Sequence, residues 1–281
     1  MIEMGQTPVA AVKQCCANFY GSAAAKYLLG DSFHPGGLCL TEELAALLVL
    51  NSDSLVLDVA SAKGTSAFFL AERFGCRVVG VDLSEENVKQ ANAEALTKGL
   101  GKQVEFRLGD AEALPFQPSI FDAIVCECAF CTFPSKATAA AEFYRVLKPG
   151  GRVGISDITK DAADLPGLDG LLAWIACIGD AQSLAQYSNW LAGAKLNVSL
   201  SEPRDRYLRE MVQAIRSKLL VADILIGLKK LDLPGLDLQQ AKAFSKAAQD
   251  AIAAGHLGYG LLVASKEQQS RNNQMGSLVS Y

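Results

Sequence analysis

The sequence predicts an α/β fold with a seven-stranded, mostly parallel sheet and helices on both faces. Short runs rich in β-formers alternate with segments of helical apolar spacing along most of the chain, which is typical of parallel strands joined by helices. Half of the 281 residues are hydrophobic, which is ample for a well-buried core. The chain therefore holds one large α/β domain, or such a domain with an elaboration.

Each element follows from a local pattern, and Gly, Pro and polar clusters separate the elements. The expected strands are 55–60, 76–83, 103–110, 120–127, 151–157, 195–202 and 258–266. The expected helices cover 9–29, 40–50, the segment up to about Phe74, 85–98, 135–147 and 167–192. The implied organisation is an N-terminal helical cap (1–50), a core (51–203), a helical insertion (204–257), the last strand (258–266) and a flexible tail (267–281).

The insertion interrupts the alternation just before the last strand. A helical stripe of apolar residues runs through its first half, and LDLPGLDL at 231–238 is typical of a turn into a second helix. The stripe consists of Leu208, Met211, Val212, Ile215, Leu219 and Leu220. Such a stripe packs against a core in most proteins, and the alternative is a lid over the substrate side of the domain.

Composition restricts the partners. The net charge of −4 and the lack of a run of Lys and Arg argue against nucleic acid or an anionic membrane as the main partner. The N-terminus shows no signal-peptide pattern, and no segment reaches about 18 consecutive apolar residues. We therefore expect a cytoplasmic protein, whose 8 cysteines are reduced thiols and not a disulfide framework.

Two turns carry a pattern of acidic residues at strand ends. VLDVASAKGTS (56–66) and VVGVDLS (78–84) place Asp58 and Asp82 there, and Asp110 follows the third strand. An acidic residue about 20 positions beyond such a turn reaches a ribose diol at the carboxyl edge of the sheet. The pattern resembles the S-adenosylmethionine site of class I methyltransferases, whose fold is Rossmann-like. A dinucleotide site is the competitor, but the G-x-G-x-x-G motif is missing.

The resemblance implies S-adenosylmethionine as cofactor and assigns residues to it. Asp82 would bind the ribose hydroxyls and Asp110 the adenine amine. LKPGGRVGISD (147–157) is a second, independent match to the same family. The family motif D-x-G-x-G-x-G reads D-V-A-S-A-K-G here, so Ala60 and Ala62 replace glycines, and a positive φ at Ala62 would weaken cofactor binding. The full set implied for the cofactor is Asp58, Ala60, Gly64, Asp82, Leu83, Asp110, Ala111 and Glu127.

A cluster of thiols follows the fourth strand. Cys126 and Cys128 are two positions apart at its end and are expected to point the same way, and Cys131 starts the next loop. The segment from Cys128 to Lys136, followed by EFYRVLKPGG, is similar to arsenite methyltransferases. Their second arsenic-binding cysteine corresponds to Cys177 in WIACIGDA. The resemblance implies Cys128 and Cys177 as ligands of the metalloid, with Cys131 in a catalytic role and Cys126 as a further substrate contact.

Thiols suit such an acceptor, because trivalent arsenic is soft and its lone pair attacks a methyl group with no proton to remove. The chain has only two histidines, His34 and His256, whereas an O-methyltransferase that depends on a base would need one. GDSFHPGG (30–37) precedes the first strand, and there Asp31, His34 or the Gly36 and Gly37 amides would contact substrate or cofactor. The alternative for this segment is a simple turn between two helices.

Several features depart from the arsenite enzymes. GTSAFFL (64–70) carries no cysteine where that family commonly has one, and Cys126 and Cys131 are additional. A third thiolate could come from either of these, from Cys39, or from Cys15 and Cys16. For all of these cysteines, the alternative is a buried side chain that packs as a small hydrophobic residue.

Three functions therefore stay open. The favoured one is methyl transfer from S-adenosylmethionine to a thiol-bound soft acceptor, above all arsenite, with a cellular thiol as possible reductant. The others are methylation of an organic thiol or another small molecule, and a cytosolic metal- or metalloid-binding protein with a degenerate cofactor site.

Overall fold

The computed structural model describes residues 23–30, 34–162, 164–233 and 236–268. The helices are α2 (Ala23–Leu29), α3 (Gly37–Leu48), α4 (Thr65–Phe74), α5 (Glu85–Thr97), η1 (Phe130–Thr132), α6 (Lys136–Val146), α7 (Gly170–Ile175), α8 (Leu184–Gly193), α9 (Asp205–Gly227) and α10 (Leu238–Ala253). The strands are β1 (Leu55–Val59), β2 (Arg77–Asp82), β3 (Val104–Leu108), β4 (Phe121–Glu127), β5 (Leu147–Lys160), β6 (Leu196–Pro203) and β7 (Leu257–Lys266).

The strands form one seven-stranded sheet in the order β3-β2-β1-β4-β5-β7-β6. The first five strands in this order are parallel, and β7 runs antiparallel to both of its neighbours. The chain order reverses between β1 and β4, and ligands of open α/β sheets bind beyond the carboxyl ends of strands at such a switch point. The predicted fold class is confirmed.

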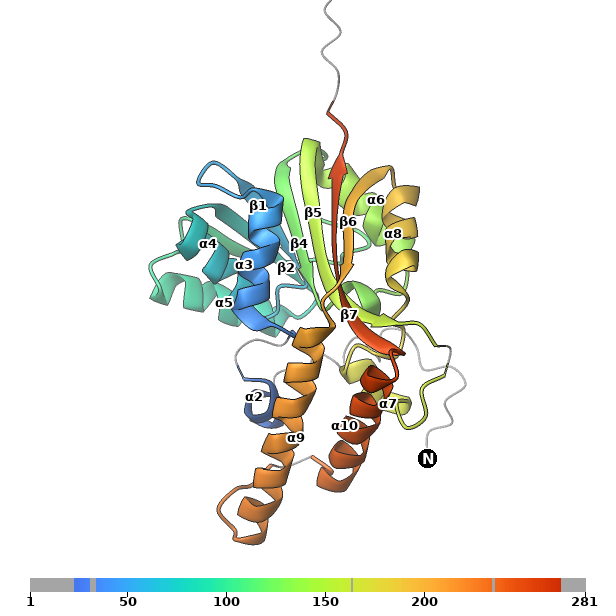
Figure 1. Cartoon of the computed structure of the whole chain (residues 1–281). Helices are drawn as coiled ribbons and strands as arrows, with labels where there is room; N and C mark the ends of the chain where they lie inside the picture. The colour runs from blue at the N-terminus through green and yellow to red at the C-terminus, as the bar shows by residue number, and fades with distance from the viewer. Residues whose placement is uncertain (1–22, 31–33, 163, 234–235, 269–281) are drawn as a thin grey trace, which may run out of the picture.

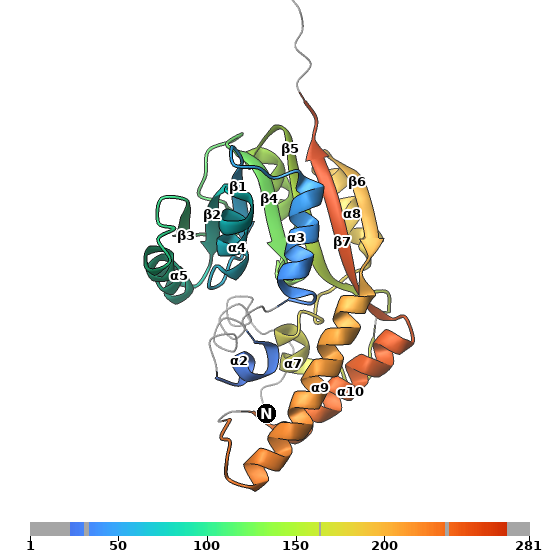
Figure 2. The same ribbon diagram turned by 60° about the vertical axis from the view of Figure 1, so that its left-hand side comes forward.

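Burial explains why the sequence forms these strands. The apolar runs of β1, β2 and β4 are buried along almost their whole length, as expected of central strands covered on both faces. The edge strand β6 alternates between buried or half-buried and exposed residues over its first half. Helices α3, α4 and α5 cover one face of the sheet, and α6 and α8 cover the other (Figures 1 and 2).

The element boundaries differ from the predicted ones at several points. The expected helix at 167–192 is two helices, α7 and α8, separated by the turn that carries Cys177. The fifth strand begins earlier, at Leu147, because this residue already pairs with Phe121 of β4, and the register shifts before Arg152 pairs with Ala123. Residues 9–22 of the expected first helix, and most of the tail, lie outside the described residues.

Helices α9 and α10 lie in the range 204–257 and pack on one another beyond the carboxyl edge of the parallel strands (Figure 1). Leu208, Val212 and Leu219 of the predicted stripe are buried. Leu220 is 60% exposed, because one further position along a helix turns its side chain away from the direction of the buried Leu219. No helix in the described part of the chain is long and apolar enough to cross a membrane.

Candidate active site

The turn after β1 adopts the geometry that glycine usually supplies, although alanine occupies two of its positions. Ala60 and Ala62 have φ of 57° and 46°, in the left-handed region that costs an alanine roughly 1 kcal/mol. Gly64 is the N-cap of α4 with φ of 83°, and a Cβ there would lie 2.3 Å from the Phe106 ring. Ala62 therefore has the positive φ considered above for its effect on cofactor binding. Because the turn already has this conformation, the strain lowers the stability of the folded turn.

Asp82 lies at the carboxyl end of β2 and organises this turn. One carboxylate oxygen accepts the Ala62 amide at 2.8 Å, and the other accepts the Ser84 amide at 2.8 Å and the Asn87 side chain at 3.2 Å. Ser84 also caps α5 by accepting from the Asn87 amide. The predicted ribose ligand is thus already oriented by two backbone amides, one from the turn after β1 and one from the turn after β2.

Asp58 and Ser61 are the polar side chains beneath the turn. Asp58 is only 4% exposed, and burial, together with the charges of Glu127 and Asp82, raises the pKa of its carboxyl well above the usual range. Among the described residues, Asp58 Oδ2 and Ser61 Oγ are buried without a hydrogen-bond partner. Buried polar atoms are almost always paired. The turn therefore calls for a ligand with hydrogen-bond donors, which suits the amino-acid end of S-adenosylmethionine.

Glu127 ends β4 and is surrounded by hydrogen-bond donors. It accepts from Ser66 Oγ at 2.6 Å and from Thr41 Oγ1 at 3.1 Å, and His34 Nε2 lies 3.6 Å from its Oε2. Predicted contacts Glu127 and His34 are thus brought together. Thr41 and Ser66 were missed, because nothing in their local sequence marks a hydroxyl that reaches a residue 61 to 86 positions away.

The remaining predicted cofactor residues lie at the ends of β2 and β3. Leu83 is 51% exposed just after β2, and Ala111 is buried. Asp110 lies beyond the end of β3, which stops at Leu108, and its carboxylate accepts the Glu112 amide at 3.0 Å. Asp31 and the Cys15 and Cys16 thiols lie outside the described residues.

The structure brings Cys128, Cys131 and Cys177 together from two loops. Cys177 donates to the Cys128 carbonyl at 3.4 Å, and its thiol is hydrogen-bonded to the thiols of Cys128 and Cys131. Contact with Cys177 and burial raise the pKa of Cys128, and burial and contact with Cys177 raise that of Cys131. These are protonated thiols in mutual contact.

The two predicted ligand cysteines share an unusual backbone conformation. Cys128 and Cys177 have φ of 52° and 61°, where side chains other than glycine are uncommon. Cys128 follows the end of β4, so the alternation of a strand does not set its direction. Cys126 lies within β4 and is completely buried, and burial raises the pKa of its thiol. Cys39 is exposed on α3.

Asp157 lies beneath the thiols and was missed as a site residue, although its GISD segment had been singled out. The carboxyl is completely buried in β5 and accepts the amides of Cys131 at 2.8 Å and Ile158 at 2.7 Å, and also the Cys131 thiol. Burial raises the pKa of Asp157 to about 7, and the hydrogen bonds oppose this rise. The thiol site therefore has an internal proton acceptor. Its position at the end of the predicted strand 151–157 was the available signal.

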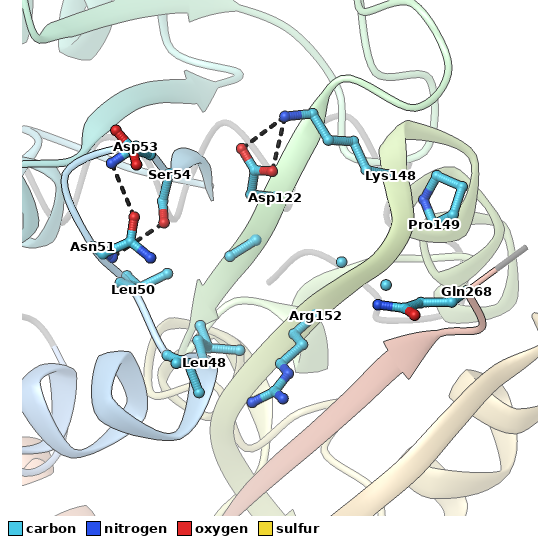
Figure 3. Close-up of a pocket in the computed structure, with 14 residues that line it drawn as sticks. Leu48, Leu50, Asn51, Asp53, Ser54, Asp122, Lys148, Pro149, Arg152 and Gln268 are labelled. Carbon is cyan, nitrogen blue, oxygen red and sulfur yellow. Dashed lines mark hydrogen bonds and ion pairs between the residues drawn. The ribbon is translucent and has the colours of Figure 1, made fainter.

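Two further observations define the site by contrast. In the described ranges, no group of three or more His, Cys, Asp or Glu side chains is arranged to hold a metal ion. A cavity of about 390 Å³ opens at the opposite edge of the sheet, where Asp122 and Lys148 form an ion pair at 2.8 Å (Figure 3). None of the predicted site residues lines this cavity. The cofactor turn and the thiols thus belong to the carboxyl edge, and the cavity does not.

The sheet order, the strand-end carboxylates and the turn after β1 define a class I methyltransferase fold. Residues 56–151 match the family described as "methyltransferase domain". Across 238 residues the chain is 29% identical to methyltransferase GfsG of Streptomyces halstedii, covering 84% of this chain and 82% of that protein. Across 138 residues it is 33% identical to the arsenite methyltransferase of Halobacterium salinarum, covering 46% of this chain and 35% of that enzyme.

The chain spans half the length or less of several other curated relatives that it matches. Among solved structures, a candidate sarcosine dimethylglycine methyltransferase from Galdieria sulphuraria is similar with a TM-score of 0.75 and 20% identity, over 90% of this chain and 98% of that one. The predicted resemblance to class I S-adenosylmethionine-dependent methyltransferases is confirmed.

Proposed function

We propose that this protein is an S-adenosylmethionine-dependent methyltransferase whose acceptor is a soft element held by Cys128 and Cys177, with arsenite as the favoured substrate. The single observation that carries the acceptor is the convergence of these two thiols from left-handed backbone positions. Glycine would occupy both positions at lower cost, by roughly 1 kcal/mol each. Strain of this kind is concentrated at functional sites.

The cofactor would lie over the turn after β1. Asp82 would bind the ribose hydroxyls, Asp110 the adenine amine, and Asp58 Oδ2 would accept from the amino group, which satisfies a buried acceptor. When bound, the cofactor supplies an electrophilic methyl group: the lone pair of arsenic forms the As–C bond, the sulfonium S–C bond breaks, and its electron pair stays on sulfur.

The thiols would capture the acceptor by exchange. Each As–S bond replaces an As–OH group, and the thiol proton leaves with the hydroxide as water. Asp157 accepts the Cys131 thiol hydrogen bond, so it can hold a proton at this site near neutral pH. The methylated arsenic is formally oxidised by two electrons, so further turnover requires a cellular thiol as reductant.

The test uses two cysteine variants and two matched controls. Wild type, Cys128→Ser and Cys177→Ser are titrated with S-adenosylhomocysteine, then incubated with labelled S-adenosylmethionine and arsenite, antimonite, selenite, tellurite or small thiols. A hard oxygen replaces a soft sulfur, so we expect methyl transfer to fall by about 100-fold or more, with unchanged cofactor affinity. The exposed Cys39→Ser and the buried Cys76→Ser control for loss of a thiol and for loss of stability. Full arsenite methylation by both site variants would refute the proposal.

A second candidate function is methylation of an organic acceptor. The absence of a preformed metal-binding cluster in the described residues favours it, as do relatives whose names give other acceptors, such as phosphoethanolamine. In that case the thiols are packing groups, and the acceptor is activated from the His34 and Glu127 side. The panel separates the two candidates, since an organic acceptor would be methylated by Cys128→Ser in proportion to its folded fraction.

A further inference from the structure

Lys136 is a buried lysine that none of the steps above uses. It is the first residue of α6, and only 4% of its surface is exposed. Its ammonium donates to the Phe133 carbonyl at 3.1 Å and to the Asp180 carboxylate, and lies 5.8 Å from the centre of the Trp190 ring. These three contacts hold the end of the Lys136 side chain in place.

The pair joins the two segments that carry the thiols. Lys136 follows η1, the turn that holds Cys131, by four positions, and Asp180 follows Cys177 by three. In the described chain, the bond between Lys136 and Asp180 is the one side-chain hydrogen bond between segments 128–136 and 176–182, apart from the contacts of the thiols themselves. The ion pair thus joins the two segments whose thiols are in contact.

The backbone hydrogen bonds of the Cys177 turn lead to α7 and to β5. The amides of Ile178 and Gly179 donate to the Ala173 carbonyl of α7, and the Lys160 amide of β5 donates to the Gln182 carbonyl. A further backbone bond, from the Ala181 amide to the Ile178 carbonyl, lies within the turn, and none of these backbone bonds reaches the segment of Cys128. Asp180 lies between the anchors and supplies a side-chain bond to that segment.

Stability alone does not explain an ion pair whose lysine is buried. Removing the Lys136 ammonium from water costs several kcal/mol, and a well-packed apolar residue often serves stability equally well or better. The pair does favour one geometry, because an arrangement that separates Asp180 from Lys136 leaves the buried ammonium without its carboxylate partner. Two soft ligands that share one acceptor need such a fixed geometry.

We propose that Lys136 and Asp180 are positioning residues that hold Cys177 at the distance from Cys128 and Cys131 required to share one thiophilic acceptor. This inference rests on the proposed function, because a shared acceptor is what the spacing serves. Lys136 and Asp180 would not touch the cofactor or the reacting atoms. Their loss should therefore weaken acceptor capture and leave cofactor binding intact.

The test compares Lys136→Met and Asp180→Asn with the wild-type chain. Phenylarsine oxide, which bridges two neighbouring thiols, probes the spacing, and S-adenosylhomocysteine probes the cofactor turn. We expect both variants to lose about tenfold or more in phenylarsine oxide affinity and to raise the KM for arsenite more than they lower kcat. Affinity for S-adenosylhomocysteine should stay within about twofold of wild type. Lys136→Arg, which keeps the charge, should recover most of the affinity.

Two controls make the result specific. Lys242→Met breaks the ion pair of Lys242 with Asp223 between α10 and α9 and should change neither affinity. Asp180 is 38% exposed, so Asp180→Asn should fold even if Lys136→Met does not. Wild-type phenylarsine oxide affinity in Asp180→Asn, or a parallel loss of both ligands, would overturn the positioning role. If the wild-type chain and Cys128→Ser capture phenylarsine oxide equally, the proposed thiol site itself is wrong, and the positioning role falls with it.

Discussion

Replacing Asp157 by asparagine should change how stability depends on pH, because this carboxyl is neutral more readily in the folded chain than in the unfolded one. Its folded pKa is about 7, against 3.8 for the ordinary group. Between these values the folded state binds one more proton than the unfolded state, so stability falls as pH rises. The stability that this extra bound proton gives the folded chain is fully present below pH 3.8 and is lost as the pH rises through about 7.

The size of the effect follows from the shift. A rise of about 3 units corresponds to about 4 kcal/mol, the upper limit of what Asp157 removes from stability between pH 4 and pH 7.5. The side chain introduced by Asp157→Asn cannot titrate. Its amide offers only one acceptor oxygen to the amides of Cys131 and Ile158, which lowers the free energy of unfolding by about 1–3 kcal/mol at every pH. The wild type should therefore exceed the variant in stability most clearly at low pH.

Urea unfolding of both proteins at pH 4.5, 5.5, 6.5 and 7.5, in steps of roughly one unit across the titration, measures the difference. Other titrating groups, including the buried Asp58, are common to both chains and cancel to first order. We expect the advantage of the wild type to shrink steadily toward neutral pH. An advantage that is constant across this range, or that grows with pH, would refute the account of Asp157 as a buried carboxyl.

Three further predictions concern the cofactor turn. Asp82→Ala should weaken S-adenosylhomocysteine binding at least about tenfold by calorimetry, because it removes charge-assisted hydrogen bonds and frees the Ala62 amide. The control is Asp53→Ala, which changes an exposed aspartate. Unchanged affinity in Asp82→Ala would contradict the role of Asp82. Ala62→Gly should raise stability by about 0.5 kcal/mol, since relief of the left-handed strain outweighs the added freedom of the unfolded chain; a lower melting temperature would speak against strain at this residue. Gly64→Ala should lower the free energy of unfolding in urea by about 2–4 kcal/mol, because the added Cβ would lie 2.3 Å from the Phe106 ring and the residue has a left-handed backbone. An unchanged free energy of unfolding would show that the turn can relax.

The sequence alone determined the class of fold and the residues at the strand ends. Period-two and period-3.6 apolar patterns reflect burial of whole faces, so β1, β2 and β4 were predictable without knowledge of their neighbours. The same patterns place Asp58, Asp82 and Glu127 at the carboxyl edge, because parallel strands end together there. Helix boundaries at 170–193 were less predictable, since the intervening turn is held by hydrogen bonds to α7 and β5.

Only the tertiary structure decided how these residues meet. The contacts of Cys177 with Cys128 and of Lys136 with Asp180 join segments 44 to 49 positions apart, and no local pattern encodes a pairing of that kind. The buried carboxyl of Asp157 becomes a proton acceptor through desolvation, which depends on everything packed around β5. Local sequence fixes what a segment buries, whereas the environment of a side chain is a property of the whole packed chain.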